Sequence, residues 1–289
     1  MMAASSYIPT SLHWLRKPVR LGKRIGSAGE SLGFVAVFVW QVLSSVPLTL
    51  RRYRDETLRA VTDMTWGRGS IIVGGGTVPM MIVLGLVMGA SVGVESFASL
   101  DMLGMGPVTG VISAYATTRE LAPIAAAIGF AAQAGCRITA EIGSMRISEE
   151  IDAIEALGLR SVPFVVTTRV IAGAIAIVPT FLIALILSYG ACRGLLTMVY
   201  GQSAGVYDHY FFQFISGFDM IAAVIKVAVF GTVVILVHSY FGFFATGGPE
   251  GVGIASGRAV RASSVAIVAI DMVLSIMLWG FNSAISFTG

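Results

Sequence analysis

An arginine and a glutamate stand side by side within a long apolar run of the sequence. Arg119 and Glu120 lie in residues 110–134, which are otherwise mostly alanine, isoleucine, glycine and other uncharged residues. A run of this length can cross a bilayer, where ionisable side chains are costly unless they have partners or face water. We therefore expect the pair to mark a functional position, either as a clamp that fixes helix packing or as a direct participant in transport.

Three further charged residues lie in or near apolar runs and could likewise serve either packing or transport. Glu141 lies just beyond this run, and Lys226 and Asp271 lie in two later apolar runs. Pairing two buried opposite charges avoids the cost of isolating either one, so we predict a structural ion pair between Lys226 and Asp271. If the carboxylates and the lysine instead carried protons, the chain would be an ion-coupled transporter. Such transporters commonly have inverted repeats with broken helices, and the sequence shows no convincing repeat.

The composition identifies the class of protein that must position these residues. Hydrophobic residues make up 56 % of the chain and charged residues 12 %, whereas a soluble domain carries roughly 25 % charged residues. Five apolar runs each approach or exceed the roughly 20 residues that a transmembrane helix needs. We predict an all-α polytopic membrane protein. The predicted spans are residues 71–94, 108–134, 162–189, 220–244 and 262–281.

A sixth apolar run, residues 32–50, decides the predicted topology. Clusters of arginine and lysine stand both before it, in residues 16–24, and after it, in residues 51–68. If this run crossed the membrane, one cluster would lie outside, against the tendency of basic residues to stay in the cytoplasm. We therefore predict that residues 1–68 are a cytoplasmic N-terminal part with an interfacial or re-entrant helix, and that the C-terminus is outside. A true sixth transmembrane helix is the alternative.

Two patterns occur in the first predicted span. Gly85, Gly89 and Gly93 recur every four residues, which places them on one helix face and lets another helix approach closely. The same span offers flexible and apolar side chains for a lipid path, with packing against the next helix as the alternative. The candidates for this path are Met80, Met81, Leu84 and Met88.

The densest polar segment predicts a short amphipathic helix over residues 147–157. Ser148 is a suitable N-cap, and the carboxylates that follow suit the N-terminal end of a helix dipole. Helices that lie on lipid are normally rich in lysine and arginine, so this acidic helix is better suited to docking a protein. The predicted docking residues are Ser148, Glu149, Glu150, Ile151, Asp152 and Glu155.

The sequence contains no recognisable catalytic or ligand-binding motif. The three histidines, His13, His209 and His238, are far apart, and no phosphate-binding glycine loop ending in Gly-Lys-Ser/Thr is present. Cys136 and Cys192 are predicted at opposite membrane surfaces, Cys192 at the start of an outer loop, so they cannot form a disulfide within one chain. We expect no catalytic residue, metal site, bound cofactor or nucleic-acid site. His238 is expected to be a packed or hydrogen-bonded residue.

The segment TTRELAPIAAAIGFAAQAGCRITAEIGSMRISEEIDAIEALG resembles the signature region of the MlaE/YrbE permease family. The Arg-Glu-Leu-x-Pro step matches residues 119–123, the Ala-Glu-Ile-Gly-x-Met step matches residues 140–145, and a following acidic helix matches residues 148–153. Lys226 with Phe230-Gly231, residues 251–255 and Asp271 fit the C-terminal pattern. The resemblance extends from about residue 69 to the end, so residues 69–289 are expected to be the permease domain. Ala132-Gln133 and Glu150 depart from the common family pattern.

This resemblance implies a set of partners. Members are membrane subunits of lipid-transporting ABC systems that work with MCE-domain proteins in a bacterial inner membrane. The implied partners are a cytoplasmic ATPase that uses ATP and Mg²⁺ and a second permease subunit. Actinobacterial systems pair two unlike permeases, so the resemblance implies a second subunit that differs from this one. The implied substrate is a phospholipid, fatty acid or sterol-like lipid. A non-transporting membrane scaffold is the other alternative, and co-purification of an ATPase discriminates among the three interpretations.

Overall fold

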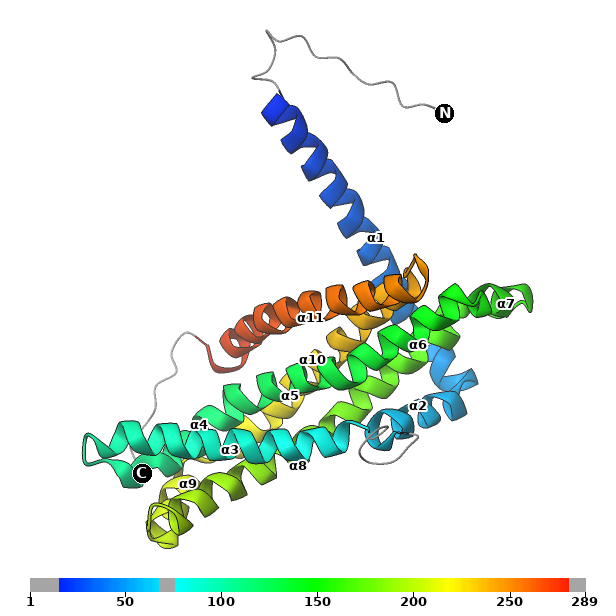
Figure 1. The fold of residues 1–289 in the computed structure, drawn as a ribbon. Helices are drawn as coiled ribbons and strands as arrows, with labels where there is room; N and C mark the ends of the chain where they lie inside the picture. Colours follow the sequence, from blue (N-terminus) through cyan, green and yellow to red (C-terminus); the bar gives the residue numbers. More distant parts are fainter. Residues whose placement is uncertain (1–15, 68–75, 281–289) are drawn as a thin grey trace. The chain divides into compact units, whose positions relative to one another are not determined.

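The computed structural model describes residues 16–67 and 76–280, with side chains from residue 33 onward. All regular elements in these two ranges are helices (Figure 1). The chain divides into two compact units, Met1–Ser44 and Ser45–Gly289. The described part of the first unit belongs to α1, Arg16–Arg52, which continues as one helix through Pro47. Residues 32–50 form one unbroken stretch of this helix, and their interfacial or re-entrant placement stays a prediction.

The second unit is built from long apolar helices joined by short segments. Its principal helices are α2 (Arg54–Trp66), α3 (Thr77–Asp101), α4 (Thr109–Ala116), α5 (Ala122–Phe130), α6 (Cys136–Ile147), α7 (Glu150–Ala156), α8 (Thr168–Met198), α9 (Ala204–Phe214), α10 (Gly217–Phe243) and α11 (Gly248–Trp279). The 3₁₀-helix η2 (Gly106–Val108) precedes α4.

Three π-helical segments join or begin the long helices. They are η3 (Thr117–Leu121), η4 (Ala131–Gly135) and η5 (Val162–Thr167). Because η3 and η4 join α4, α5 and α6 end to end, one helical path runs from Gly106 to Ile147. The helix that contains the second predicted span therefore continues past residue 134 to Ile147. π-Segments inside helices are frequent at functional sites, and η3 contains both Arg119 and Glu120.

Six helical stretches in the described residues are long and apolar enough to cross a membrane. They are Gly33–Arg52, Thr77–Asp101, Gly106–Ile147, Val162–Met198, Gly217–Phe243 and Gly248–Trp279. Each of the five predicted spans overlaps one of the last five stretches. The beginning of the first predicted span, residues 71–75, and position 281 lie outside the described residues. Whether Gly33–Arg52 spans or lies in the interface stays a prediction.

The glycines of α3 face α8. A Cβ at Gly85 would lie 2.3 Å from the carbonyl oxygen of Ala184, and one at Gly89 would lie 2.0 Å from that of Ser188. A Cβ at Gly93 would lie 3.1 Å from the Leu195 side chain. The glycine stripe therefore lets α3 and α8 pack backbone against backbone within this chain.

Cysteine labelling tests the predicted topology of the N-terminal part. With Cys136 and Cys192 replaced by serine, single cysteines at Ala28 and Glu56 should both react with an impermeant maleimide only from the cytoplasmic side. The reason is that both positions lie beside basic clusters that favour the cytoplasm. Labelling of one position from outside would show that Gly33–Arg52 crosses the membrane.

Candidate functional site

Four of the five charged residues singled out in the sequence lie in one polar network. Arg119 and Glu120 come from η3, Lys226 from α10 and Asp271 from α11. Lys226 is completely buried at its centre. Its Nζ lies 3.1 Å from Glu120 Oε2 and 2.6 Å from Asp271 Oδ1. The structure thus contains the predicted Lys226–Asp271 pair and adds Glu120 to it.

Two uncharged groups complete the lysine site. Lys226 Nζ donates to Ser275 Oγ at 2.9 Å, and Ser275 donates to Glu120 Oε1 at 2.8 Å. The ammonium also donates to the main-chain carbonyl of Arg119 at 2.8 Å. Pro123 has no N–H with which to reach this carbonyl four residues earlier, so the proline helps to make an acceptor available to the lysine. The spacing of four residues between Arg119 and Pro123 thus provides Lys226 with a main-chain acceptor.

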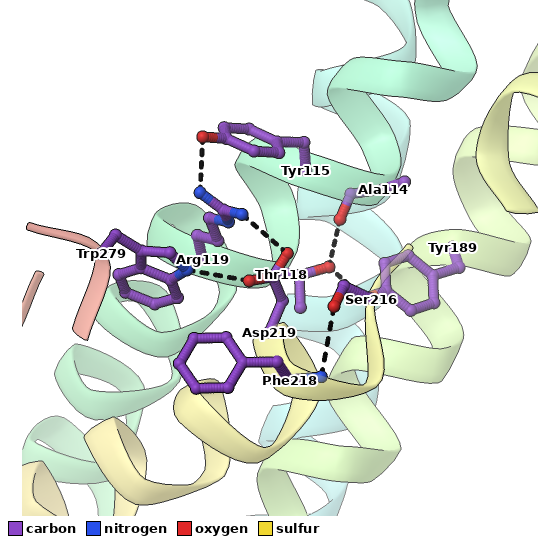
Figure 2. A network of polar contacts seen from close by, with 9 residues as sticks. All are labelled: Ala114, Tyr115, Thr118, Arg119, Tyr189, Ser216, Phe218, Asp219 and Trp279. Carbon is purple, nitrogen blue, oxygen red and sulfur yellow. Dashed lines mark hydrogen bonds and ion pairs between the residues drawn. The ribbon is translucent and has the colours of Figure 1, made fainter. Parts of the chain in front are cut away.

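Arg119 forms the second half of the network (Figure 2). Its Nη2 lies 3.0 Å from Asp219 Oδ2, and its Nη1 donates to the Tyr115 hydroxyl at 2.5 Å. The guanidinium carbon lies 3.8 Å from the centre of the Tyr115 ring and 5.0 Å from that of Trp279. Trp279 Nε1 in turn donates to Asp219 Oδ1 at 2.8 Å. An arginine between two aromatic faces and a carboxylate gains both cation–π and ionic stabilisation.

Trp279 connects the two halves of the network. Its ring lies 5.3 Å from Lys226 Nζ as well as beside Arg119. Asp219 is buried in the first turn of α10, where a carboxylate suits the helix dipole. Contacts from η3, α10 and α11 therefore meet around two cations. This arrangement joins three helices and leaves neither cation isolated.

Neighbouring hydroxyl groups extend the polar contacts to α8. Thr118 contacts the Tyr189 hydroxyl at 2.5 Å and also donates to the Ala114 carbonyl (Figure 2). Ser216 caps α10 by accepting a hydrogen bond from the Phe218 N–H at 3.2 Å. The cap fixes the start of the helix that carries Asp219 and Lys226.

Sequence reasoning missed Tyr115, Asp219, Ser275 and Trp279. The fourth predicted span begins at residue 220 and therefore excludes Asp219. A helical spacing signal was available. Asp219 and Lys226 are seven residues apart, and Asp271, Ser275 and Trp279 follow one another at steps of four. Both spacings place residues on one helix face.

Glu141 lies outside this network. Its Oε1 is 2.7 Å from Arg169 Nη2, at the point where α6 meets the start of α8. Arg169 also donates to the carbonyl of Val165 at 2.6 Å. Glu141 is therefore part of a second polar cluster, and its partner Arg169 was not singled out in the sequence.

The acidic helix begins later than predicted. Helix α7 covers Glu150–Ala156, and its N-cap position is Glu149, in the left-handed region with φ 60°. The predicted N-cap role of Ser148 is wrong, because Ser148 ends α6 and its hydroxyl donates to the Ser144 carbonyl at 2.9 Å. Gly158, with φ 78°, lies just after the helix. No side chain caps the start of α7 in the described structure.

The helix α7 exposes both acidic and apolar side chains. Ile151 is buried, whereas Leu157 is 78 % exposed. Asp152 pairs with Arg146 at 2.7 Å, and Glu155 accepts a hydrogen bond from Ser161. The carboxylates of Glu149 and Glu150 lie on the exposed side of this turn. An exposed leucine among carboxylates is suited to contact with a protein.

The lipid-path candidates on α3 are not equally accessible. Met81 is fully buried, and its Cε is 3.8 Å from where a Cβ at Gly129 would lie. Leu84 also reaches the Gly129 position, at 3.2 Å, and is half-buried. Met80 and Met88 are half-buried too. Met81 is therefore buried against neighbouring helices of this chain, and the lipid-path role of all four residues stays a prediction.

His238 is a buried, hydrogen-bonded residue, and the two cysteines form no disulfide. The His238 ring is completely buried, with Nδ1 2.8 Å from Thr139 Oγ1 and Nε2 3.4 Å from Ser263 Oγ. Cys136 and Cys192 are both free thiols. Cys192 lies buried within α8, so its predicted position at the start of a loop is wrong. The helix continues beyond it to Met198.

Comparisons with known proteins agree with the signature motifs. A Haemophilus influenzae protein named intermembrane phospholipid transport system permease protein MlaE is 27 % identical over 210 residues, which cover 71 % of this chain and 80 % of that protein. A probable ABC transporter permease protein of Rickettsia bellii is 26 % identical over 260 residues, covering 88 % of this chain and 95 % of the relative.

A plant protein and a family model extend this comparison. Protein TRIGALACTOSYLDIACYLGLYCEROL 1, chloroplastic, of Arabidopsis thaliana is 30 % identical over 188 residues, which cover 65 % of this chain and 54 % of that protein. The family model described as Permease MlaE matches residues 68–277, which include the whole charged network up to Ser275. This membrane protein therefore belongs to the MlaE permease family.

Proposed function

We propose that this chain is the permease subunit of an ABC transporter that moves lipids at a bacterial inner membrane. The observation that carries the proposal is the match to the MlaE permease family over residues 68–277. Two relatives support it by their names, which include ABC transporter permease and phospholipid transport. ATP hydrolysis, with its Mg²⁺, belongs to a separate ATPase, because this sequence lacks the phosphate-binding loop that such chemistry uses.

The proposed partners are a second permease subunit, a cytoplasmic ATPase and MCE-domain proteins on the other side of the membrane. The sequence departures in the signature region support a second subunit that is unlike this one. The N-terminus is cytoplasmic and the C-terminus is outside in this proposal, because the basic clusters flank residues 32–50 on both sides.

The charged network acts as a clamp in this account. Lys226 is fully buried and has four oxygen atoms within 3.1 Å of its Nζ. Acceptors are therefore present for all three of its N–H groups, and none is left to bind a substrate. Arg119 is likewise held between two aromatic rings. A clamp of this kind makes η3, α10 and α11 respond together when force is applied at one end of the bundle. It favours the packing interpretation over direct contact with the substrate.

Docking of the ATPase is assigned to α7 and the turn before it. This segment directly follows α6, which ends the helical path that contains η3. Movement of a docked ATPase would therefore reach the clamp through one continuous helix. Exposed Glu149, Glu150 and Leu157 supply charge and apolar surface for the contact.

Charge reversal tests the docking assignment. The double variant E149K/E150K should reduce ATPase co-purification by at least about tenfold, because breaking close interfacial charge pairs costs roughly 2–5 kcal/mol. The measurement is the ATPase-to-permease ratio after affinity purification of the permease.

The matched control for this experiment is E95K/D101K. It makes the same charge change on exposed residues in the C-terminal part of α3. The control should keep normal co-purification. Equal ATPase recovery with E149K/E150K and with the parent chain would show that the ATPase docks elsewhere.

A further inference from the structure

A cavity of about 300 Å³ lies at the end of the bundle that leads into α7, away from the charged network. Its walls come from α2, the first residues of α3, the path from η4 into α6, and the region where η5 meets α8. Three arginines line it, Arg59, Arg137 and Arg169. The cavity is not used by the clamp or by the docking segment.

The arginines of this cavity differ in what they contact. Arg169 pairs with Glu141 at 2.7 Å, and Arg59 lies 3.6 Å from Glu56. Arg137 donates from Nη1 to the main-chain carbonyl of Asp63 at 2.8 Å. No carboxylate in the described part of the chain lies within ion-pair distance of Arg137. Arg137 is therefore half-buried and forms no ion pair within 4.0 Å in the described residues, although Asp63 and Glu141 line the same cavity.

The donors of Arg137 indicate the chemistry of a ligand. A guanidinium has five N–H donors in a planar fork that matches the oxygens of a phosphate. One of these N–H groups is used by the Asp63 carbonyl, and Arg137 is one of the residues that line the cavity. A guanidinium without an ion-pair partner at the end of a membrane-spanning bundle favours an anionic ligand.

The remaining walls indicate a ligand with an apolar part. Met64, Ile138, Met145 and Phe164 line the same cavity. Helix α2, which forms one wall, exposes Leu58 at 64 % and Trp66 at 65 %. Tryptophan is enriched at membrane–water interfaces, so exposed Trp66 suits an element close to the membrane surface. The mouth of the cavity would then be at the level of lipid headgroups.

We propose that this cavity binds the phosphate of a phospholipid headgroup, with Arg137 as the main ligand and the apolar wall against the adjoining glycerol and acyl region. The site lies at the bundle end assigned to the cytoplasm, so it would take lipid from the inner leaflet. The choice of a lipid over a free phosphate rests on the proposed transport function and on the apolar wall. The phosphate chemistry itself does not depend on them.

Native mass spectrometry of the full chain in detergent tests this site. The probes are dihexanoyl phosphatidylglycerol, dihexanoylglycerol without phosphate, and inorganic phosphate. We expect R137Q to weaken binding of the phospholipid by about tenfold or more, as is typical when charge-assisted hydrogen bonds are lost. R261Q removes an exposed arginine of α11 that does not line the cavity and should bind like the parent chain.

A second variant keeps Arg137 and blocks the space. Ala60 is half-buried and lines the cavity, so A60F should fill it and cause a similar loss of phospholipid binding. Thermal unfolding midpoints of both variants without ligand separate lost binding from lost folding. The phosphate-free glyceride should bind at least about tenfold more weakly than the phospholipid to the parent chain.

Three outcomes would decide against the proposal. Unchanged phospholipid binding in both R137Q and A60F, or equal binding of the glyceride and the phospholipid, would overturn the site. Inorganic phosphate that binds as tightly as the phospholipid would keep a phosphate site and overturn its assignment to a lipid. A separate outcome concerns the proposed function. If the parent chain binds the headgroup normally but its reconstituted assembly moves no lipid with ATP, the transport proposal fails and this site stays.

Discussion

Replacement of Lys226 by methionine should lower the free energy of unfolding by about 3–5 kcal/mol. The side chain is fully buried, and its removal would leave Glu120 and Asp271 facing each other without the cation that both contact. The Arg119 carbonyl would also lose a donor. Denaturant titration of the purified chain in mild detergent measures this effect.

Two further variants separate the clamp from general sensitivity to mutation. Arg258 is exposed, so R258M should change the free energy of unfolding by less than about 0.5 kcal/mol. The double variant K226M/D271N should be less destabilised than the sum of K226M and D271N, because contacting residues are energetically coupled. Additive effects of K226M and D271N, or a K226M chain as stable as its parent, would contradict the clamp.

Substitution of Gly89 by alanine should disrupt the packing of α3 on α8. The new Cβ would lie 2.0 Å from the Ser188 carbonyl oxygen, and because this is main chain, one of the two helices has to move. Overpacking typically costs about 1–3 kcal/mol, and the long helical contact places this position at or above the upper end of that range. The yield of monodisperse folded protein and its unfolding midpoint measure the effect.

Gly190 provides the matched control for this substitution. It lies in α8, and a Cβ there would meet no atom within 4 Å. G190A should be neutral or more stable by up to about 1 kcal/mol, since alanine favours a helix over glycine. Equal behaviour of G89A and G190A would mean that α3 and α8 do not pack as closely as described.

Features that depend on the geometry or composition of a single helix could be predicted from the sequence. The four-residue spacing of Gly85, Gly89 and Gly93 depends only on helix geometry, and all three glycines lie against α8 in the structure. The apolar runs and the costly charges within them likewise follow from the properties of the bilayer. The Lys226–Asp271 pair could be predicted because buried opposite charges need each other.

Other features depend on contacts between helices, which a single sequence does not specify. Asp219 became a site residue only because α10 begins before it and Trp279 reaches it from α11. Glu141 was grouped with the intramembrane charges, but its partner is Arg169 at another place in the fold. Ser148 fits the chemistry of an N-cap, yet the turn through Glu149 keeps it on α6. The second predicted span stops at residue 134, whereas the π-segment η4 continues the helix through Gly135 into α6.

The clamp and the docking segment together make a specific mechanical account. Helix α6 links α7 to η4, and α5 links η4 to η3, where Arg119 and Glu120 hold α10 and α11. Energy from a docked ATPase would therefore be transmitted through covalently continuous helix. An ion-coupled transporter would have no need of an ATPase at this position, and a scaffold would move no lipid.

The most direct test reconstitutes this chain, the ATPase and second permease that co-purify with it, and an MCE-domain partner in proteoliposomes that contain a fluorescent phospholipid. The account predicts that the lipid leaves or enters the liposome membrane when ATP and Mg²⁺ are supplied. The same preparation with an ATPase that cannot hydrolyse ATP should show only the background rate. Lipid movement driven by a proton gradient without the ATPase, or no ATP-dependent movement in an intact assembly, would contradict the account.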